Sequence, residues 1–193
     1  MVLVDDPLVD AAALVPGLVL DLRYARADNA FRRAVYDVPV FALRRSVAER
    51  RAGGARALAA EGLRLVAFDG YRPLSVQRLL WQLCPVVGYV APPERGSNHN
   101  RGTAVDVSLA DARGTPVEMP CDYDEFSARA HHDDAGCSPA AQRNRSELKR
   151  AMEAAGFSAN RMEWWHYDAP DARAAALEDV PLAALKGAGG GST

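Results

Sequence analysis

The chain is poor in cysteine and lysine, and it has no long apolar run. Its three cysteines, Cys84, Cys121 and Cys137, form no Cys-x-x-Cys pair, which argues against a disulfide framework but leaves open one reactive or metal-binding thiol. Of its 23 basic residues only Lys149 and Lys186 are lysines, and the formal net charge of −2 gives no reason to expect nucleic acid or an anionic membrane as a partner.

No apolar stretch is long enough to cross a bilayer, and the start lacks a basic segment followed by an apolar one. We therefore expect a cytoplasmic protein. With 193 residues, 49% apolar and 25% charged, the composition is that of an ordinary globular protein. We expect one domain over residues 1–186, followed by a flexible Gly-rich tail over residues 187–193.

The hydrophobic pattern predicts strands and helices in an irregular order. Strands are expected at 18–24, 63–68, 104–109 and 162–167, with a segment at 115–119 that pairs back on the third. Helices are expected at 41–62, 75–83 and 138–156, with a last helical turn within 172–177. This order favours an α+β fold, with a small, largely antiparallel central sheet flanked by helices, over a doubly wound parallel sheet.

A histidine and an aspartate flank a turn in the stretch Gly96–Leu109. His99 and Asp106 lie seven residues apart, with Asn100-Arg-Gly between them and an alternating apolar and polar run after them. Both residue types bind Zn²⁺, but two ligands do not make a site. A turn histidine beside a capping aspartate would look the same, so the pair needs a third ligand.

The segment 162–167 supplies a third candidate, because it places Glu163 three residues before His166. On a straight strand these two side chains would lie on opposite faces, but a bend at the intervening tryptophans would let both address one site. His99, Asp106 and His166 would then leave one coordination position open, as in catalytic rather than structural zinc. A carboxylate such as Glu163 could serve there as a base for a water.

Two spaced motifs and several shorter blocks carry a family resemblance. The motifs are Ser97-x-His99-x-x-Gly102-x-Ala104-x-Asp106 and Glu163-x-Trp165-His166. The blocks are Leu22 to Asn29, Phe68 to Pro73, Met119 to His132 and Asn144 to Phe157. Together they resemble the zinc D,D-peptidases, and most of all the VanX-type D-alanyl-D-alanine dipeptidases of peptidase family M15. The resemblance implies the α+β fold that these enzymes share with hedgehog-like domains, with a zinc site at the sheet.

The resemblance also implies catalytic roles. It implies one Zn²⁺ per chain, with three ligands: His99, Asp106 and His166. Glu163 matches the general base and acid, and Arg72 matches the arginine that steadies the oxyanion of the tetrahedral intermediate. A guanidinium on a Pro-bounded turn suits that role, because its donors are held where negative charge develops.

Three further residues match positions that hold the dipeptide. Asp124 falls where an aspartate faces the substrate ammonium, and Tyr24 and Ser97 match residues that line the pocket. Simpler interpretations stay open, since Asp124 lies in an acidic run and Arg72 in a turn that would suit a surface. Asn100 replaces the small hydroxyl residue usual in the family, which bears on the shape of the pocket.

We expect the adjacent His131 and His132 to be structural, or to support the ligands of the first metal site from outside, rather than to form a second metal site. We expect the two tryptophans to pack around the first site. The expected function is zinc-dependent hydrolysis of D-alanyl-D-alanine to two D-Ala, in cell-wall precursor metabolism, glycopeptide resistance or self-protection. The expected partner is a small dipeptide, and the oligomeric state is not predicted. The alternatives are a D,D-carboxypeptidase or endopeptidase acting on peptidoglycan stem peptides, and a non-catalytic zinc-binding module of the same fold.

Overall fold

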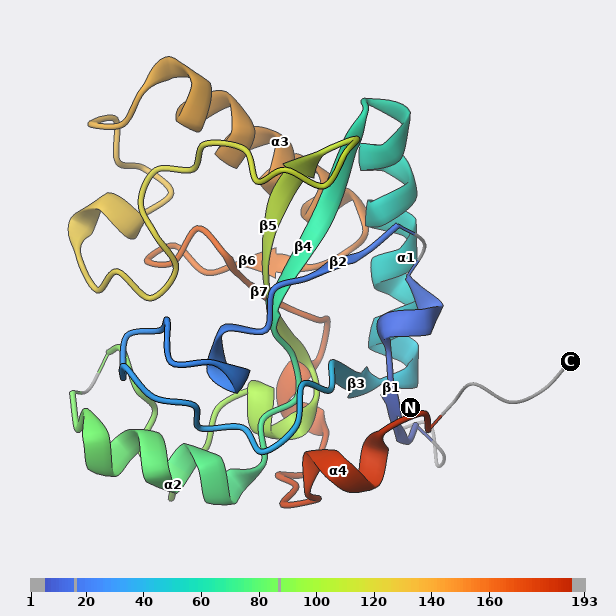
Figure 1. Cartoon of the computed structure of the whole chain (residues 1–193), viewed down its shortest axis with the longest axis vertical. Coiled ribbons are helices and arrows are strands. Elements are labelled where there is room, and N and C mark those ends of the chain that lie inside the picture. Colours follow the sequence, from blue (N-terminus) through green and yellow to red (C-terminus); the bar gives the residue numbers. More distant parts are fainter. Residues whose placement is uncertain (1–5, 16, 87, 189–193) are drawn as a thin grey trace, which may run out of the picture.

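The computed structural model describes residues 6–15, 17–86 and 88–188 (Figure 1). Its centre is a five-stranded sheet in the order β2-β4-β5-β7-β6. The strands are β2 (Val19–Leu20), β4 (Leu63–Asp69), β5 (Ala104–Asp111), β6 (Ser158–Ala159) and β7 (His166–Asp168). β2 runs parallel to β4, and every other neighbouring pair is antiparallel. A separate antiparallel pair joins β1 (Leu8–Asp10) to β3 (Ala42–Arg44).

Two long helices, α1 (Arg45–Ala60) and α3 (Pro139–Ala154), lie against the sheet. The shorter helices are α2 (Leu74–Leu83) and α4 (Leu182–Leu185). α1 contacts β4 and α3, and α3 contacts β5 and β6, while Figure 1 shows α2 at the opposite end of the molecule from α3. α3 begins as expected, since the Ser138 hydroxyl accepts a hydrogen bond from the N–H of Ala141 (3.1 Å). The expected α+β fold with a largely antiparallel sheet is confirmed.

β5 explains how a polar site can lie on a buried sheet. Its side chains alternate between two faces, with Val107 and Leu109 on one and Asp106 and Ser108 on the other, and all four are buried. The register with β4 shifts between Ala67 and Asp69, so that Asp69 comes to lie opposite Asp106. Irregularities of this kind often turn a side chain toward a functional site.

Several expected elements match the structure. The strands predicted at 63–68 and 104–109 and the helices at 75–83 and 138–156 are present as β4, β5, α2 and α3. Residues 115–119 pair back through a bridge between Ala110 and Pro116. The helical turn expected within 172–177 is the 3-10 helix η5 (Ala172–Ala174).

The predictions at two early segments were wrong in part. The strand expected over 18–24 pairs only at Val19–Leu20 and then turns into a 3-10 helix, η2 (Arg23–Ala25). The helix expected over 41–62 begins only at Arg45, because Ala42–Arg44 forms β3 instead. Three residues are too few for strand alternation to show in a sequence, so pairing with β1 overrides the local pattern.

The strand expected over 162–167 is also misplaced, since β7 covers His166–Asp168. The chain turns before it, with the N–H of Glu163 bonded to the carbonyl of Asn160 (3.3 Å) and the N–H of His166 to that of Glu163 (3.1 Å). This is the bend that a shared site for Glu163 and His166 requires.

The last described residues are tied to β1. The N–H of Gly187 donates to the Asp10 carboxylate (3.1 Å), and the Ala188 carbonyl accepts from the N–H of Asp10 (2.7 Å). Residues 189–193, the rest of the expected Gly-rich tail, lie outside the described residues. Among the residues that are described, no helix combines the length and the apolar character needed to span a bilayer.

Candidate active site

His99 is presented by a one-turn 3-10 helix, η3 (His99–Arg101), just before β5. Asn100 in the same turn is fully buried; its side-chain oxygen accepts from the N–H of Ser97 (2.7 Å), and its amide donates to the carbonyl of Arg72 (2.8 Å). The N–H of Arg72 donates to the carbonyl of His99 (3.0 Å). Asn100 therefore braces the segment of His99 against that of Arg72, and it is not among the residues that line the cavity.

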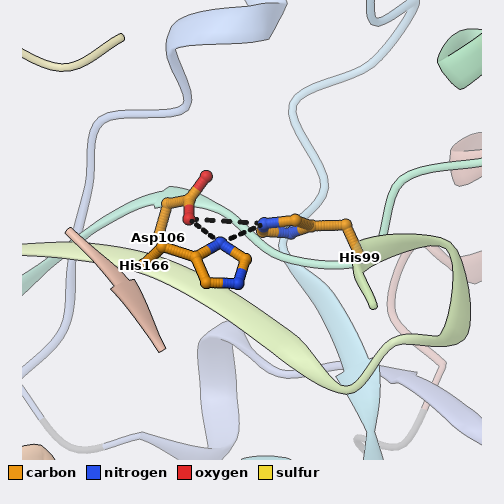
Figure 2. Close-up of side chains that lie close together, drawn as sticks. All are labelled: His99, Asp106 and His166. Carbon is orange, nitrogen blue, oxygen red and sulfur yellow. Dashed lines mark hydrogen bonds and ion pairs between the residues drawn. The ribbon is translucent and has the colours of Figure 1, made fainter. Parts of the chain in front are cut away.

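Three potential metal ligands from two strands and a turn converge (Figure 2). Nε2 of His99 lies 3.1 Å from Nδ1 of His166 and 3.3 Å from Oδ1 of Asp106. Nδ1 of His166 lies 3.1 Å from the same Asp106 oxygen. Ligand atoms around a tetrahedral ion with bonds of 2.0–2.1 Å stand about 3.3–3.4 Å apart, so this triangle fits such an ion.

The outer atoms of all three side chains are already bound. Nδ1 of His99 lies 2.7 Å from the carbonyl oxygen of Gly70, and Nε2 of His166 lies 3.1 Å from a carboxylate oxygen of Asp168. Oxygens can only accept here, so in the neutral form of each ring the proton lies on the outer nitrogen and the lone pair of the other nitrogen points inward.

The carboxylate of Asp106 is fixed in the same way, because Tyr123 donates its hydroxyl proton to Oδ2 (2.8 Å), while Oδ1 faces the inward nitrogens of the two rings. Three inward lone pairs repel one another unless a cation lies between them. The donor set therefore fits a metal ion.

The pKa shifts of the candidate ligands also indicate that the site favours a cation. Burial opposes ionisation of Asp106, but the neighbouring His99 and His166 outweigh it and hold the pKa of this carboxyl well below its usual range. Burial opposes a charge on His166 too, yet its hydrogen bonds to Asp106 and Asp168 raise its pKa well above the usual value. The cluster thus favours one positive charge at its centre, which a proton or a metal ion can supply.

Glu163 lies beside this cluster, with Oε2 3.9 Å from Nδ1 of His166 and a side chain that is 15% exposed. Its pKa is raised, mainly by burial and against the opposing effect of His166. A carboxyl group shifted toward neutrality is suited to both accepting and donating a proton. Trp165 lines the same cavity and is packed edge-on against Trp164, with the ring centroids 5.3 Å apart.

Arg72 is buried and held by three partners. Its Nε and Nη2 donate to one carboxylate oxygen of Asp69 (3.2 and 2.7 Å), and its Nη1 donates to Gln77 (2.9 Å). Asp69 is itself fixed by the hydroxyl of Tyr36 (2.5 Å). The guanidinium of Arg72 also lies over the ring of Tyr24, 5.0 Å from the ring centroid. These contacts hold Arg72 in one orientation at the wall of the cavity.

The site opens into a cavity of about 360 Å³, within the range of small-molecule sites. Its wall includes all eight residues singled out in the sequence: Tyr24, Arg72, Ser97, His99, Asp106, Asp124, Glu163 and His166. Tyr24 donates its hydroxyl proton to Asp124 (2.9 Å), and Ser97 accepts from the N–H of His99 (3.2 Å). Burial, followed by the negative charge of Asp106, raises the pKa of Asp124 well above its ordinary value.

The sequence did not reveal the residues that orient the site: Tyr36, Gly70, Gln77, Tyr123, Asn160 and Asp168. Each acts through a contact between segments or through a turn, for which the chain offers no spacing rule. Asp168 alone had a local signal, because a carboxylate two residues after a candidate ligand on a strand lies on the same face.

The adjacent histidines lie away from the metal ligands. His132 packs edge-on against Tyr167 (centroids 6.2 Å apart), and the carbonyl of His131 accepts from Arg145 (2.9 Å). Neither lines the cavity. Their contacts agree with the structural role expected for them.

Comparisons with known proteins agree with the motifs. A family model described as Peptidase_M15, D-ala-D-ala dipeptidase, matches residues 5–182. The chain is 40% identical over 165 residues to a D-alanyl-D-alanine dipeptidase of Escherichia coli K12, covering 86% of each protein. It is 32% identical over 178 residues to one from Enterococcus faecalis, covering 80% of this chain and 87% of the relative.

A looser likeness is to the crystal structure of the vancomycin resistance D,D-dipeptidase VanXYg in complex with a D-Ala-D-Ala phosphinate analogue. The TM-score is 0.45 and the identity 22%, and the match covers 83% of this chain but 59% of that one. The match to the family model spans most of the chain and the two dipeptidases are similar over most of their lengths, so the resemblance seen in the motifs is confirmed. The chain belongs to the D-Ala-D-Ala dipeptidase family of the M15 peptidases.

Proposed function

We propose that this chain is a zinc dipeptidase that hydrolyses D-alanyl-D-alanine to two molecules of D-alanine. The observation that carries the proposal is the triangle of three inward ligand atoms, 3.1–3.3 Å apart. The outer polar atoms of the same three side chains are hydrogen-bonded to other residues. Two imidazoles and one carboxylate suit Zn²⁺, and three protein ligands leave a position for water or substrate. Membership of the dipeptidase family supports the substrate.

The metal and the residues around the triangle would have separate roles in peptide hydrolysis. Bound Zn²⁺ would supply a Lewis acid that polarises the peptide carbonyl and lowers the pKa of a water. Glu163 would take a proton from the attacking water and give one to the leaving amine; its carboxylate, 3.9 Å from Nδ1 of His166, supports this role. Asp69 and Gln77 use three of the five N–H groups of Arg72, which leaves two for the oxygen where negative charge develops.

The other end of the cavity is suited to a free amino terminus. Asp124 offers a carboxylate in the cavity wall, and Tyr24 fixes one of its oxygens. An ammonium group is a natural partner for such a carboxylate, and an acylated amine is not. In the cytoplasm such an activity would draw on the dipeptide used for cell-wall precursors, as in glycopeptide resistance or self-protection.

The test measures the alanine that the zinc-loaded protein releases from D-Ala-D-Ala, from L-Ala-L-Ala and from a stem tripeptide ending in D-Ala-D-Ala. We expect turnover of the first substrate to be strongly preferred. Faster cleavage of the tripeptide would favour a carboxypeptidase instead, and no turnover of any peptide would favour a non-catalytic module.

Glu163→Ala tests the mechanism, because it should retain zinc and lose about 10²–10⁴-fold in kcat. Glu153→Ala, on the exposed side of α3, is the matched control and should keep wild-type turnover. Near-normal activity of Glu163→Ala would contradict the assignment of the base.

A further inference from the structure

We propose that Asn160 is a positioning residue for Glu163, holding its carboxylate beside the metal ligands through one side-chain hydrogen bond. Nδ2 of Asn160 donates to Oε2 of Glu163 at 2.8 Å. The inference rests on the proposed function, since it assigns a residue to the base of that reaction. Asn160 lines the same cavity as Glu163 but lies outside both spaced motifs.

Asn160 occupies the point where β6 passes into the turn that carries the base. Ala159, the residue before it, pairs with Tyr167, so the ladder places Asn160 opposite His166. The N–H of Asn160 donates to the His166 carbonyl (3.0 Å), and its own carbonyl accepts from the N–H of Glu163 (3.3 Å). One residue therefore links the backbone of the candidate base to that of a candidate ligand.

The direction of the side-chain amide follows from its second bond. Oδ1 of Asn160 accepts from the N–H of Met162 (3.0 Å), and a backbone N–H can only donate. The amide oxygen must therefore face Met162, which turns the NH₂ group toward Glu163. The short contact with the carboxylate is then a hydrogen bond from a neutral donor to a charged acceptor.

This bond restricts a side chain that is otherwise free to rotate. A glutamate has three side-chain torsions, and holding it in one rotamer has an entropic cost that a fixed donor offsets. The bond keeps Oε2 within 3.9 Å of Nδ1 of His166. Rates of proton transfer depend steeply on such placement, and a misplacement of about 1 Å can cost roughly 10²-fold.

The competing explanation is that Asn160 only shapes the turn. Asn160→Asp separates the two roles, because aspartate keeps the size, the backbone bonds and an oxygen for the N–H of Met162. It replaces only the donor to Glu163, with an oxygen that repels the carboxylate. Asn160→Ser is a second variant, since its hydroxyl can still serve the turn but is too short to reach Glu163.

The experiment measures kcat, KM and bound zinc for the wild type, both variants and Asn144→Asp, a matched change on α3 outside the cavity. We expect kcat for D-Ala-D-Ala to fall about 10–100-fold in both Asn160 variants, with KM within about threefold and zinc content unchanged. Asn144→Asp should behave as the wild type. In a Glu163→Ala background, Asn160→Asp should cause no further loss, because the group that it positions is absent.

Wild-type kcat in Asn160→Asp would overturn the proposal, as would a loss of activity matched by an equal loss of zinc. If one variant does not fold, the other decides by the same criteria. A wild type that releases no D-Ala overturns the proposed function and this inference with it. An active wild type beside an unchanged Asn160→Asp overturns this inference alone.

Discussion

The main-chain carbonyl of Gly70 accepts the hydrogen bond from Nδ1 of His99 (2.7 Å), so a residue without a side chain orients a candidate metal ligand. A Cβ on Gly70 would lie 2.6 Å from the carbonyl oxygen of Ala42 and 2.9 Å from Cε2 of Phe41. Both neighbours are buried, and the first is main chain, so neither can move away easily. The close approach of this residue, which directly follows β4, to the carbonyl of Ala42 in β3 therefore requires glycine here.

Gly70→Ala should lower both stability and metal affinity. Forcing a methyl group into this contact should cost about 1–3 kcal/mol of unfolding free energy. Moving the carbonyl that orients His99 should weaken zinc binding by about 10-fold or more. Denaturant unfolding of the metal-free protein and a zinc competition titration measure the two effects separately.

Gly53→Ala is the control, because a Cβ at this α1 position meets no atom within 4 Å. It should raise stability by roughly 0.5–1 kcal/mol, as alanine does in a helix interior, and leave zinc affinity unchanged. Wild-type zinc affinity in Gly70→Ala would show that the carbonyl is not needed to orient His99.

Asp168 should control zinc affinity without touching the ion. Burial acts to raise its pKa, but the hydrogen bond and charge of His166 outweigh it and lower the pKa overall. Asp168→Ala removes the acceptor that keeps the proton of His166 on Nε2, so we expect zinc affinity to fall about 10–100-fold. Competition with a chromogenic chelator measures this.

Asp133→Ala provides the comparison, since Asp133 is an exposed carboxylate paired with Arg161 at the surface. Its removal should leave zinc affinity unchanged. Equal affinities in the two variants would show that Asp168 does not fix the ring of His166.

The sequence predicted the candidate ligands but not what holds them. His99, Asp106 and His166 could be proposed from motif spacing, because ligands of one ion recur at set positions within two short segments. The strand expected at 162–167 was wrong at the site itself. The contacts of Asn160 bend the chain there, and nothing in the alternation of the aromatic residues shows them.

The structural role of Asn100 could not be predicted from the sequence either. In the sequence it was a departure with a bearing on the pocket, whereas the structure buries it as a brace between two loops. Its partners are Ser97, three residues away, and Arg72, 28 residues away. A contact over that distance depends on how β4 and β5 pair, which local patterns do not determine.

Asp124 should govern recognition of the free amino terminus. It adopts a positive φ of 57°, which asparagine tolerates better than alanine, so Asp124→Asn removes the charge with little strain. We expect KM for D-Ala-D-Ala to rise about 10–100-fold, with a much smaller effect on an N-acetylated analogue. Equal effects on the two substrates would count against an ammonium contact.

The pH dependence of KM gives a second test of the same residue. Burial, followed by the charge of Asp106, raises the pKa of Asp124, so this carboxylate is protonated at a higher pH than an ordinary aspartate. KM of the wild type should therefore rise as pH falls through that raised pKa, because the ionised form binds the ammonium. The Asp124→Asn variant should lack this rise, and a rise of the same size in both would assign it to another group.

Protonation of His132 should lower the free energy of unfolding as the pH falls, independently of the metal. Burial, with smaller effects from Lys149 and Arg145, lowers its pKa from 6.5 to about 4. The unfolded chain therefore binds a proton at this residue before the folded chain does. The contribution of the neutral His132 to the free energy of unfolding is fully present above about pH 6.5 and is lost as the pH falls from 6.5 to 4. Because the ring is partly exposed, we expect this contribution to be about 1–2 kcal/mol, less than the pKa shift alone would give.

His132→Phe tests this, since phenylalanine keeps an aromatic ring against Tyr167 but cannot be protonated. Unfolding free energies measured with a chelator present, from pH 7 to pH 4, remove any contribution from metal release. The wild type should lose about 1–2 kcal/mol more than the variant over this range. Because the two proteins share every other titrating group, parallel curves would mean that His132 is protonated as readily in the folded chain as in the unfolded one.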